Sequence, residues 1–170
     1  RPMVTDLLSW IAQERDLAFA ALMLMGFIEA CPGLGLFISG AILLSAASLI
    51  YAEGLLSLPE IVSAAVIGAF ISDQFGFYVG RYLGAELIDL PWMQKRAGLV
   101  EKTQAQLRRF GAFTVVIGRL LTMVRSLVPM LLGASGLSSI KFFLFDVIAC
   151  GIWGAGLAGL VIGVGAVLGA

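Results

Sequence analysis

The last twenty-four residues of the chain, Val147 to Ala170, contain no charged side chain. A helix rises about 1.5 Å per residue, so a helix of this length exceeds the ~30 Å hydrocarbon core of a bilayer. The composition agrees, because 60% of the 170 residues are hydrophobic and 13% are charged, about half the share in a soluble domain. These features predict an all-α, polytopic integral membrane protein with one bilayer-embedded domain, residues 1–170.

The apolar segments are of two kinds. Residues 59–84 and 140–170 are uninterrupted and are predicted to span the membrane. Residues 17–56 and 110–138 are also apolar, but proline and glycine interrupt each of them. Irregular backbone at membrane depth is tolerated only inside protein or beside a water-filled cavity, so each segment is predicted to be a re-entrant hairpin. The interrupting residues are Pro32, Gly33, Gly35 and Gly40 in the first segment, and Gly118, Pro129, Gly133 and Gly136 in the second.

This order of elements occurs twice. Three glycines of the first span, at positions 68, 76 and 80, recur eighty-three residues later at 151, 159 and 163. If each hairpin enters and leaves on one side, the middle span places the two hairpins on opposite sides of the membrane. We therefore expect two inverted repeats, each a broken hairpin followed by a spanning helix, with a binding site near the midplane.

Two polar segments flank these elements. Residues 1–16 place apolar side chains on one helical face and are predicted to be an interfacial amphipathic helix. Residues 85–109 are rich in lysine and arginine, so the positive-inside rule predicts a cytoplasmic polar loop.

Charged residues inside the apolar segments are the candidates for function. Glu29 lies in the first broken segment, and Arg119 and Arg125 lie in the second. An arginine in the bilayer costs several kcal/mol unless it is paired or hydrated, so we expect Glu29 to approach at least one arginine. The contact is either a structural ion pair between the hairpins or a shared polar site. In the second case the surplus positive charge would bind an anion such as phosphate, which a guanidinium contacts bidentately. Accessory candidates are Asp73, Arg81 and Asp146.

Other chemistries find no support in the sequence. The chain has no histidine, and its two cysteines, Cys31 and Cys150, lie in apolar segments without metal-ligand spacing. Its net charge is zero, which gives no electrostatic basis for binding nucleic acid. We therefore expect no catalytic residue, cofactor, metal or nucleic-acid partner.

An acid before a Pro/Gly turn, the helix end "FYVGRYLG", the spacing Arg-x5-Arg-x3-Pro and a final "GIWG" span together resemble the DedA family of VTT-type membrane proteins. The resemblance runs from about residue 20 to 165. It implies inverted re-entrant hairpins in a bacterial inner membrane and movement of phosphate-bearing lipids such as undecaprenyl phosphate. Several members of the family carry a second acid where this chain reads Ser39-Gly40-Ala41; Asp73 or Asp146 could take its place.

We accordingly predict a transporter or flippase for a lipid-linked phosphate, with Glu29, Arg119 and Arg125 binding the substrate. One alternative is a proton- or cation-coupled antiporter for small solutes. Another is a non-transporting membrane scaffold that partners a lipid phosphatase. The expected partners are a phosphate-bearing membrane lipid, an attached or associated lipid phosphatase, and a second copy of the chain.

Overall fold

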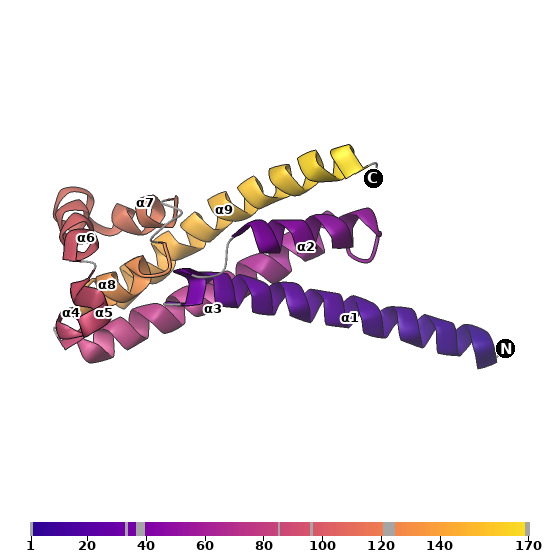
Figure 1. The fold of residues 1–170 in the computed structure, drawn as a ribbon, viewed down its shortest axis with the longest axis horizontal. Coiled ribbons are helices and arrows are strands. Elements are labelled where there is room, and N and C mark those ends of the chain that lie inside the picture. The colour runs from indigo at the N-terminus through magenta and orange to yellow at the C-terminus, as the bar shows by residue number, and fades with distance from the viewer. Residues whose placement is uncertain are drawn as a thin grey trace.

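A computed structural model gives the fold of the chain (Figure 1). Within the described residues all regular secondary structure is helical. The structure describes residues 2–32, 34–36, 40–84, 86–95, 97–120 and 125–168, of which residues 2–13, 36, 88, 92, 99, 120 and 168 are described for the backbone alone. Of the predicted turn residues, Gly33, Ser39 and residues 121–124 lie outside this part of the chain.

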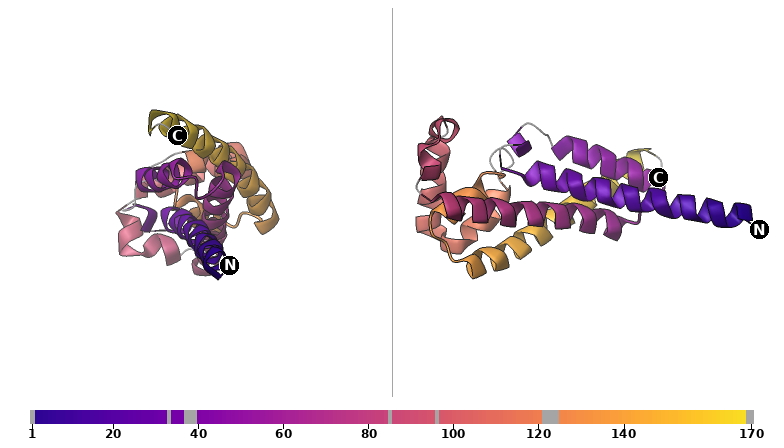
Figure 2. Two further views of the ribbon diagram at one scale, coloured as in Figure 1. Left: turned by 90° about the vertical axis from the view of Figure 1, so that its right-hand side faces the viewer. Right: turned by 90° about the horizontal axis from the view of Figure 1, so that it is seen from below.

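The first half consists of α1 (Pro2–Ala30), the short η1 (Leu34–Leu36) and α2 (Gly40–Ala52). α1 ends shortly before Pro32, which has no backbone N–H with which to continue the helix. At its last turn the N–H of Cys31 donates a hydrogen bond of 3.2 Å to the carbonyl of Ile28. α2 then runs back beside α1 (Figures 1 and 2). α1 has no break near residue 16, so the predicted interfacial segment continues directly into the first arm of the predicted hairpin.

The long helix α3 (Leu58–Leu83) follows, and its sequence marks both of its ends. At the start, the Glu60 carboxylate accepts a hydrogen bond of 2.9 Å from the backbone N–H of Ser57, as in a capping box. At the end, Gly84 has a φ of 53°, which is favourable only for glycine, and donates its N–H to the carbonyl of Gly80 at 2.9 Å.

The charged region that was predicted as a polar loop is folded into three helices, α4 (Glu86–Asp89), α5 (Pro91–Gln94) and α6 (Ala97–Phe110). α6 is amphipathic: it buries Val100 and Thr103 and exposes most of its charged side chains. It lies across the end of the long helices (Figure 2). The cytoplasmic location of this region stays a prediction.

The second half contains η2 (Gly111–Phe113), α7 (Thr114–Leu120), α8 (Val128–Ala134) and α9 (Ser139–Leu168). α7 and α8 lie at the opposite end of the molecule from α1 and α2, and both helix pairs point their adjoining ends toward the middle (Figures 1 and 2). α3 and α9 run past both pairs. Residues 58–83 and 139–167 are long and apolar enough to cross a membrane.

Glycines on α3 let both helix pairs approach closely. An added Cβ at Gly68 would overlap the carbonyl oxygen of Met23 on α1, and one at Gly80 would overlap that of Met130 on α8. Between them, a Cβ at Gly76 would lie 2.9 Å from Pro32 and 3.7 Å from Pro129. The prolines of the two broken segments therefore both lie close to Gly76, in the C-terminal half of α3.

The glycines of α9 that matched these in sequence have a different environment. A Cβ added at Gly151, Gly159 or Gly163 would meet no described atom within 4 Å. The equal spacing of the two trios therefore does not reflect equal packing, because the α3 trio packs closely against other described residues and the α9 trio does not.

Candidate functional site

The ion pairs of Arg119 join three helices in the middle of the molecule. Arg119, at the end of α7, contacts the carboxylate of Asp73 on α3, and its Nη1 lies 3.6 Å from Oδ1 of Asp146 on α9. All three residues are buried, with exposures of 7%, 3% and 1% respectively. Charged groups removed from water need such compensation, so Arg119 fixes the end of α7 against both long helices.

A second ion pair connects the two broken segments. Arg125, just before α8, places Nη2 3.0 Å from Oε1 of Glu29 in the last turn of α1. The approach of Glu29 to an arginine is therefore confirmed, although a role in substrate binding stays a prediction. Gly40 leaves room for this carboxylate, because an added Cβ there would lie 2.6 Å from Glu29 Oε1 and displace it.

Trp153 links the two arginines. The guanidinium carbons of Arg119 and Arg125 lie 5.3 and 5.2 Å from the centre of its indole ring, within the range of cation–π attraction. Sequence reasoning missed this residue as part of the site. Trp153 lies seven residues after Asp146, which is about two helical turns and hence the same face of α9, so the spacing was a usable signal.

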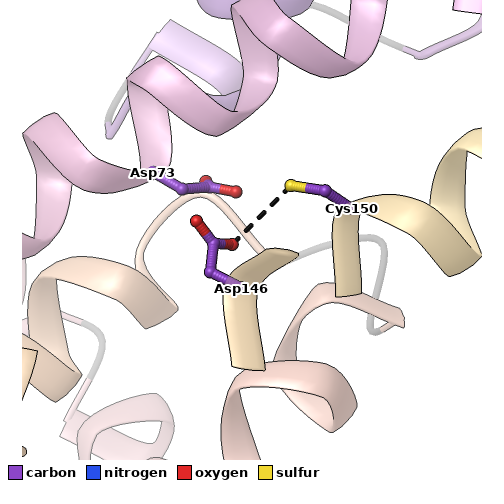
Figure 3. Close-up of side chains that lie close together, drawn as sticks. All are labelled: Asp73, Asp146 and Cys150. Atoms are coloured by element: carbon purple, nitrogen blue, oxygen red, sulfur yellow. Dashed lines mark hydrogen bonds between the residues drawn. The ribbon is translucent and has the colours of Figure 1, made fainter. Parts of the chain in front are cut away.

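Asp146 also has two neutral partners that were not predicted. Gln74 Nε2 donates a hydrogen bond of 2.8 Å to Oδ2. Cys150 Sγ lies 3.8 Å from Oδ1, as Figure 3 shows. Possible metal-ligand atoms of Asp73, Asp146 and Cys150 all fall within 4.8 Å of one another. However, the guanidinium of Arg119 contacts both carboxylates and already supplies the positive charge that a metal ion would bring. This cluster therefore fits an arginine better than a metal.

The structure corrects the charge balance expected from the sequence. We expected one glutamate facing two arginines, with surplus positive charge. Asp73 and Asp146 instead join Glu29, so three carboxylates face Arg119 and Arg125. Arg81 lies apart from this cluster: it is exposed and donates a hydrogen bond of 2.6 Å to the carbonyl of Leu137. Of the three accessory candidates, Asp73 and Asp146 thus lie in the cluster. Arg81 instead binds the backbone of the loop between α8 and α9.

Several buried polar atoms of the cluster have no hydrogen-bond partner within the described residues: Nε and Nη2 of Arg119, Nη2 of Arg125 and Oε2 of Glu29. Nη2 of Arg125 is close to Glu29 but is not aligned for a directed hydrogen bond. Both arginines and both aspartates line a cavity of about 10 Å³ together with apolar side chains. That volume is about the minimum for one water molecule.

The fold and the cluster define a helical membrane protein with ionised side chains held between interrupted helices. The chain belongs to the VTT domain family, which matches residues 17–163, and this confirms the DedA resemblance. It is an integral membrane protein of the bacterial inner membrane, as predicted.

Similar curated proteins include the inner membrane protein YabI of Escherichia coli, which is 28% identical over 85% of this chain and 57% of its own length. An uncharacterised membrane protein of Buchnera aphidicola is 26% identical over 89% of this chain and 59% of its own length. One from Mycobacterium tuberculosis is 27% identical over 95% of this chain and 74% of its own length. The chain thus spans less than two thirds of the first two of these relatives. No solved structure matches it.

Proposed function

We propose that this chain binds the phosphate group of a membrane lipid, such as undecaprenyl phosphate or a phospholipid, and moves it across the bilayer. Glu29, Arg119 and Arg125 are the substrate-binding residues of this proposal. The observation that carries it is the set of buried guanidinium N–H groups without a partner in the described residues. A planar guanidinium fork matches the oxygens of phosphate, and the desolvated setting strengthens each contact.

The proposed mechanism uses two inverted re-entrant hairpins, one from each broken segment. Its support is the placement of the pairs α1–α2 and α7–α8 at opposite ends of the molecule, with Pro32 and Pro129 both near Gly76 (Figure 1). In this proposal the substrate binds where the two tips meet. Separating one pair from α3 at a time would open the site to one side and then to the other.

The site must open before it can accept a phosphate, because a cavity of about 10 Å³ holds at most one water molecule. The contact between Glu29 and Arg125 joins the two pairs across the middle. A phosphate that takes the place of Glu29 on Arg125 would release this contact and allow the pairs to separate. Binding and opening are then one event, because the anion stabilises only the separated arrangement.

The experiment is a liposome assay that follows the movement of a lipid phosphate between leaflets. Replacement of both arginines, Arg119→Gln with Arg125→Gln, is expected to abolish movement. The matched control Arg81→Gln removes an arginine outside the cluster and is expected to leave movement intact. Failure of the wild-type protein to move any lipid phosphate would favour the scaffold alternative.

The charge balance favours one further candidate, the proton- or cation-coupled antiporter. With every group ionised, three carboxylates and two guanidiniums leave one excess negative charge, which one proton or monovalent cation would neutralise. Asp73 and Asp146 would then replace the second acid that is missing at Ala41. The two functions differ in a measurable way: collapsing an imposed pH gradient abolishes coupled antiport and leaves passive lipid movement almost unchanged.

A further inference from the structure

A pocket between α1 and α2 leads to the buried carboxylate of Glu29. Its volume is about 160 Å³, and apart from Glu29 its walls are apolar: Met25, Ile28, Ile42 and Leu43. Glu29 is only 7% exposed, and its Oε2 has no partner in the described part of the chain. An apolar pocket that ends at a buried ion pair, with one carboxylate oxygen left without a hydrogen bond in the described residues, is suited to a molecule with both apolar and polar parts.

The pocket continues outward along the surface of α2. A second, shallower hollow of about 440 Å³ shares Ile42 with the first and extends over Ser45 and Ala46 to Leu49. Ile42 and Leu49 are 53% and 57% exposed. These positions are three or four residues apart and so share one helical face. They cover about 10 Å of the helix, since each residue rises about 1.5 Å.

We propose that this groove, formed by Met25, Ile28, Ile42, Ser45 and Leu49, holds the hydrocarbon chain of the transported lipid while its phosphate reaches Arg125. The inference rests on the proposed function and adds the route by which the lipid approaches. Arg125 argues for this occupant: its Nη2 lies 3.0 Å from Glu29 Oε1, and in the proposed function the phosphate takes the place of Glu29 on this guanidinium.

The groove acts as a guide and contributes little affinity. Lipid chains already surround the protein, so moving one chain from the bilayer into an apolar groove gains no hydrophobic energy. Its role is steric: the chain stays in an apolar environment while the head enters between α1 and α2. The outer face of α2, which lies in front of α3 in Figure 1, is therefore the predicted side of access.

The first test maps the chain directly on the wild-type protein. A long-chain polyprenyl phosphate with a photoreactive diazirine near its phosphate end is reconstituted with the protein in liposomes, illuminated, and the labelled residues are identified by mass spectrometry. We expect labels on residues 40–52 that excess unlabelled polyprenyl phosphate removes. Labels spread evenly over the exposed faces of α3 and α9, unaffected by the competitor, would overturn the inference.

The second test blocks the groove. Ser45→Trp fills it at an exposed position, and Ala155→Trp places the same side chain on an exposed position of α9 as the control. A hydrocarbon chain attached to a head at Arg125 would overlap a tryptophan that fills the groove, and this steric cost should weaken binding of a long-chain polyprenyl phosphate about tenfold. A one-isoprene phosphate should bind unchanged to both variants, because it has almost no chain to place in the groove.

The outcomes separate this inference from the function on which it rests. Equal binding of the long-chain lipid to both tryptophan variants overturns the groove alone. Failure of the wild-type protein to bind either phosphate overturns the proposed function, and the groove with it. Leu49→Trp, farther from Glu29, gives a second blocking variant if Ser45→Trp does not fold.

Discussion

Replacing Arg125 by lysine tests whether the site recognises the geometry of phosphate or only its charge. Within the described residues, Arg125 has one charged partner, Glu29 at 3.0 Å, and its side chain is 11% exposed. Lysine keeps the positive charge and can still lie over Trp153, but it loses the planar fork that contacts two phosphate oxygens at once.

The magnitude follows from the hydrogen bond to phosphate that lysine cannot make. Going from two charge-assisted hydrogen bonds to one should cost about 1.5–3 kcal/mol, or roughly ten- to a hundredfold in Kd. The folded protein should lose little, because Nη2 of Arg125 makes no directed hydrogen bond within the described residues. Arg119→Lys is a poorer probe, since Arg119 contacts both Asp73 and Asp146 and its replacement disturbs buried ion pairs.

The assay is a binding titration with a short-chain polyprenyl phosphate, run beside a thermal unfolding measurement. Arg81→Lys is the matched control, because Arg81 is exposed and lies outside the cluster. Wild-type affinity in Arg125→Lys would refute recognition by geometry. Loss of folding in Arg125→Lys would instead favour a structural ion pair between Glu29 and Arg125.

Three further predictions concern packing, topology and charge. Gly80→Leu should lower the free energy of unfolding by about 3 kcal/mol, because its Cβ would overlap the carbonyl of Met130; Gly163→Leu, which meets no described atom, should change it little, and equal effects in thermal unfolding would contradict the close packing. A cysteine at Gln104 on α6 should not react with an impermeant reagent outside intact cells, and strong labelling would reverse the assigned topology. Asp73→Asn removes a partner of Arg119 and should cost about 3–5 kcal/mol of stability; a change below about 1 kcal/mol in a denaturant titration would argue against this ion pair.

The sequence predicted the pairing of Glu29 with an arginine because one physical rule governs charges in a membrane. Such groups must find partners or water, and the two broken segments were expected to meet at the same depth. The choice of Arg125 as the partner could not be predicted, because it depends on how α7 and α8 are rotated. The same limit hid the ion pairs of Arg119 with Asp73 and Asp146, because those distances depend on how α7 packs between α3 and α9.

The span predicted over residues 59–84 agrees closely with α3 (Leu58–Leu83), and local chemistry marks both ends of this helix. Ser57 with Glu60 begins α3, and a glycine with positive φ ends it. The continuity of α1 was missed because residues 14–16 carry three successive charges, Glu14, Arg15 and Asp16, which resemble the end of a segment. In the structure Arg15 instead pairs with Glu60 at the start of α3. The contact between α1 and α3 therefore includes charged residues as well as apolar ones.

The division of charged groups between interrupted and continuous helices gives the proposed transport cycle its physical basis. Glu29, Arg119 and Arg125 lie beside the breaks inside the two broken segments, whereas Asp73 and Asp146 lie within the long helices α3 and α9. When a helix pair moves, its end groups change position relative to the long helices, and each arginine must exchange one partner for another. A lipid phosphate can serve as that partner during the exchange, because it carries the negative charge that the departing carboxylate removes. An arginine left without a partner would cost several kcal/mol at this depth, so movement of a helix pair is expected to be slow without the lipid and faster with it.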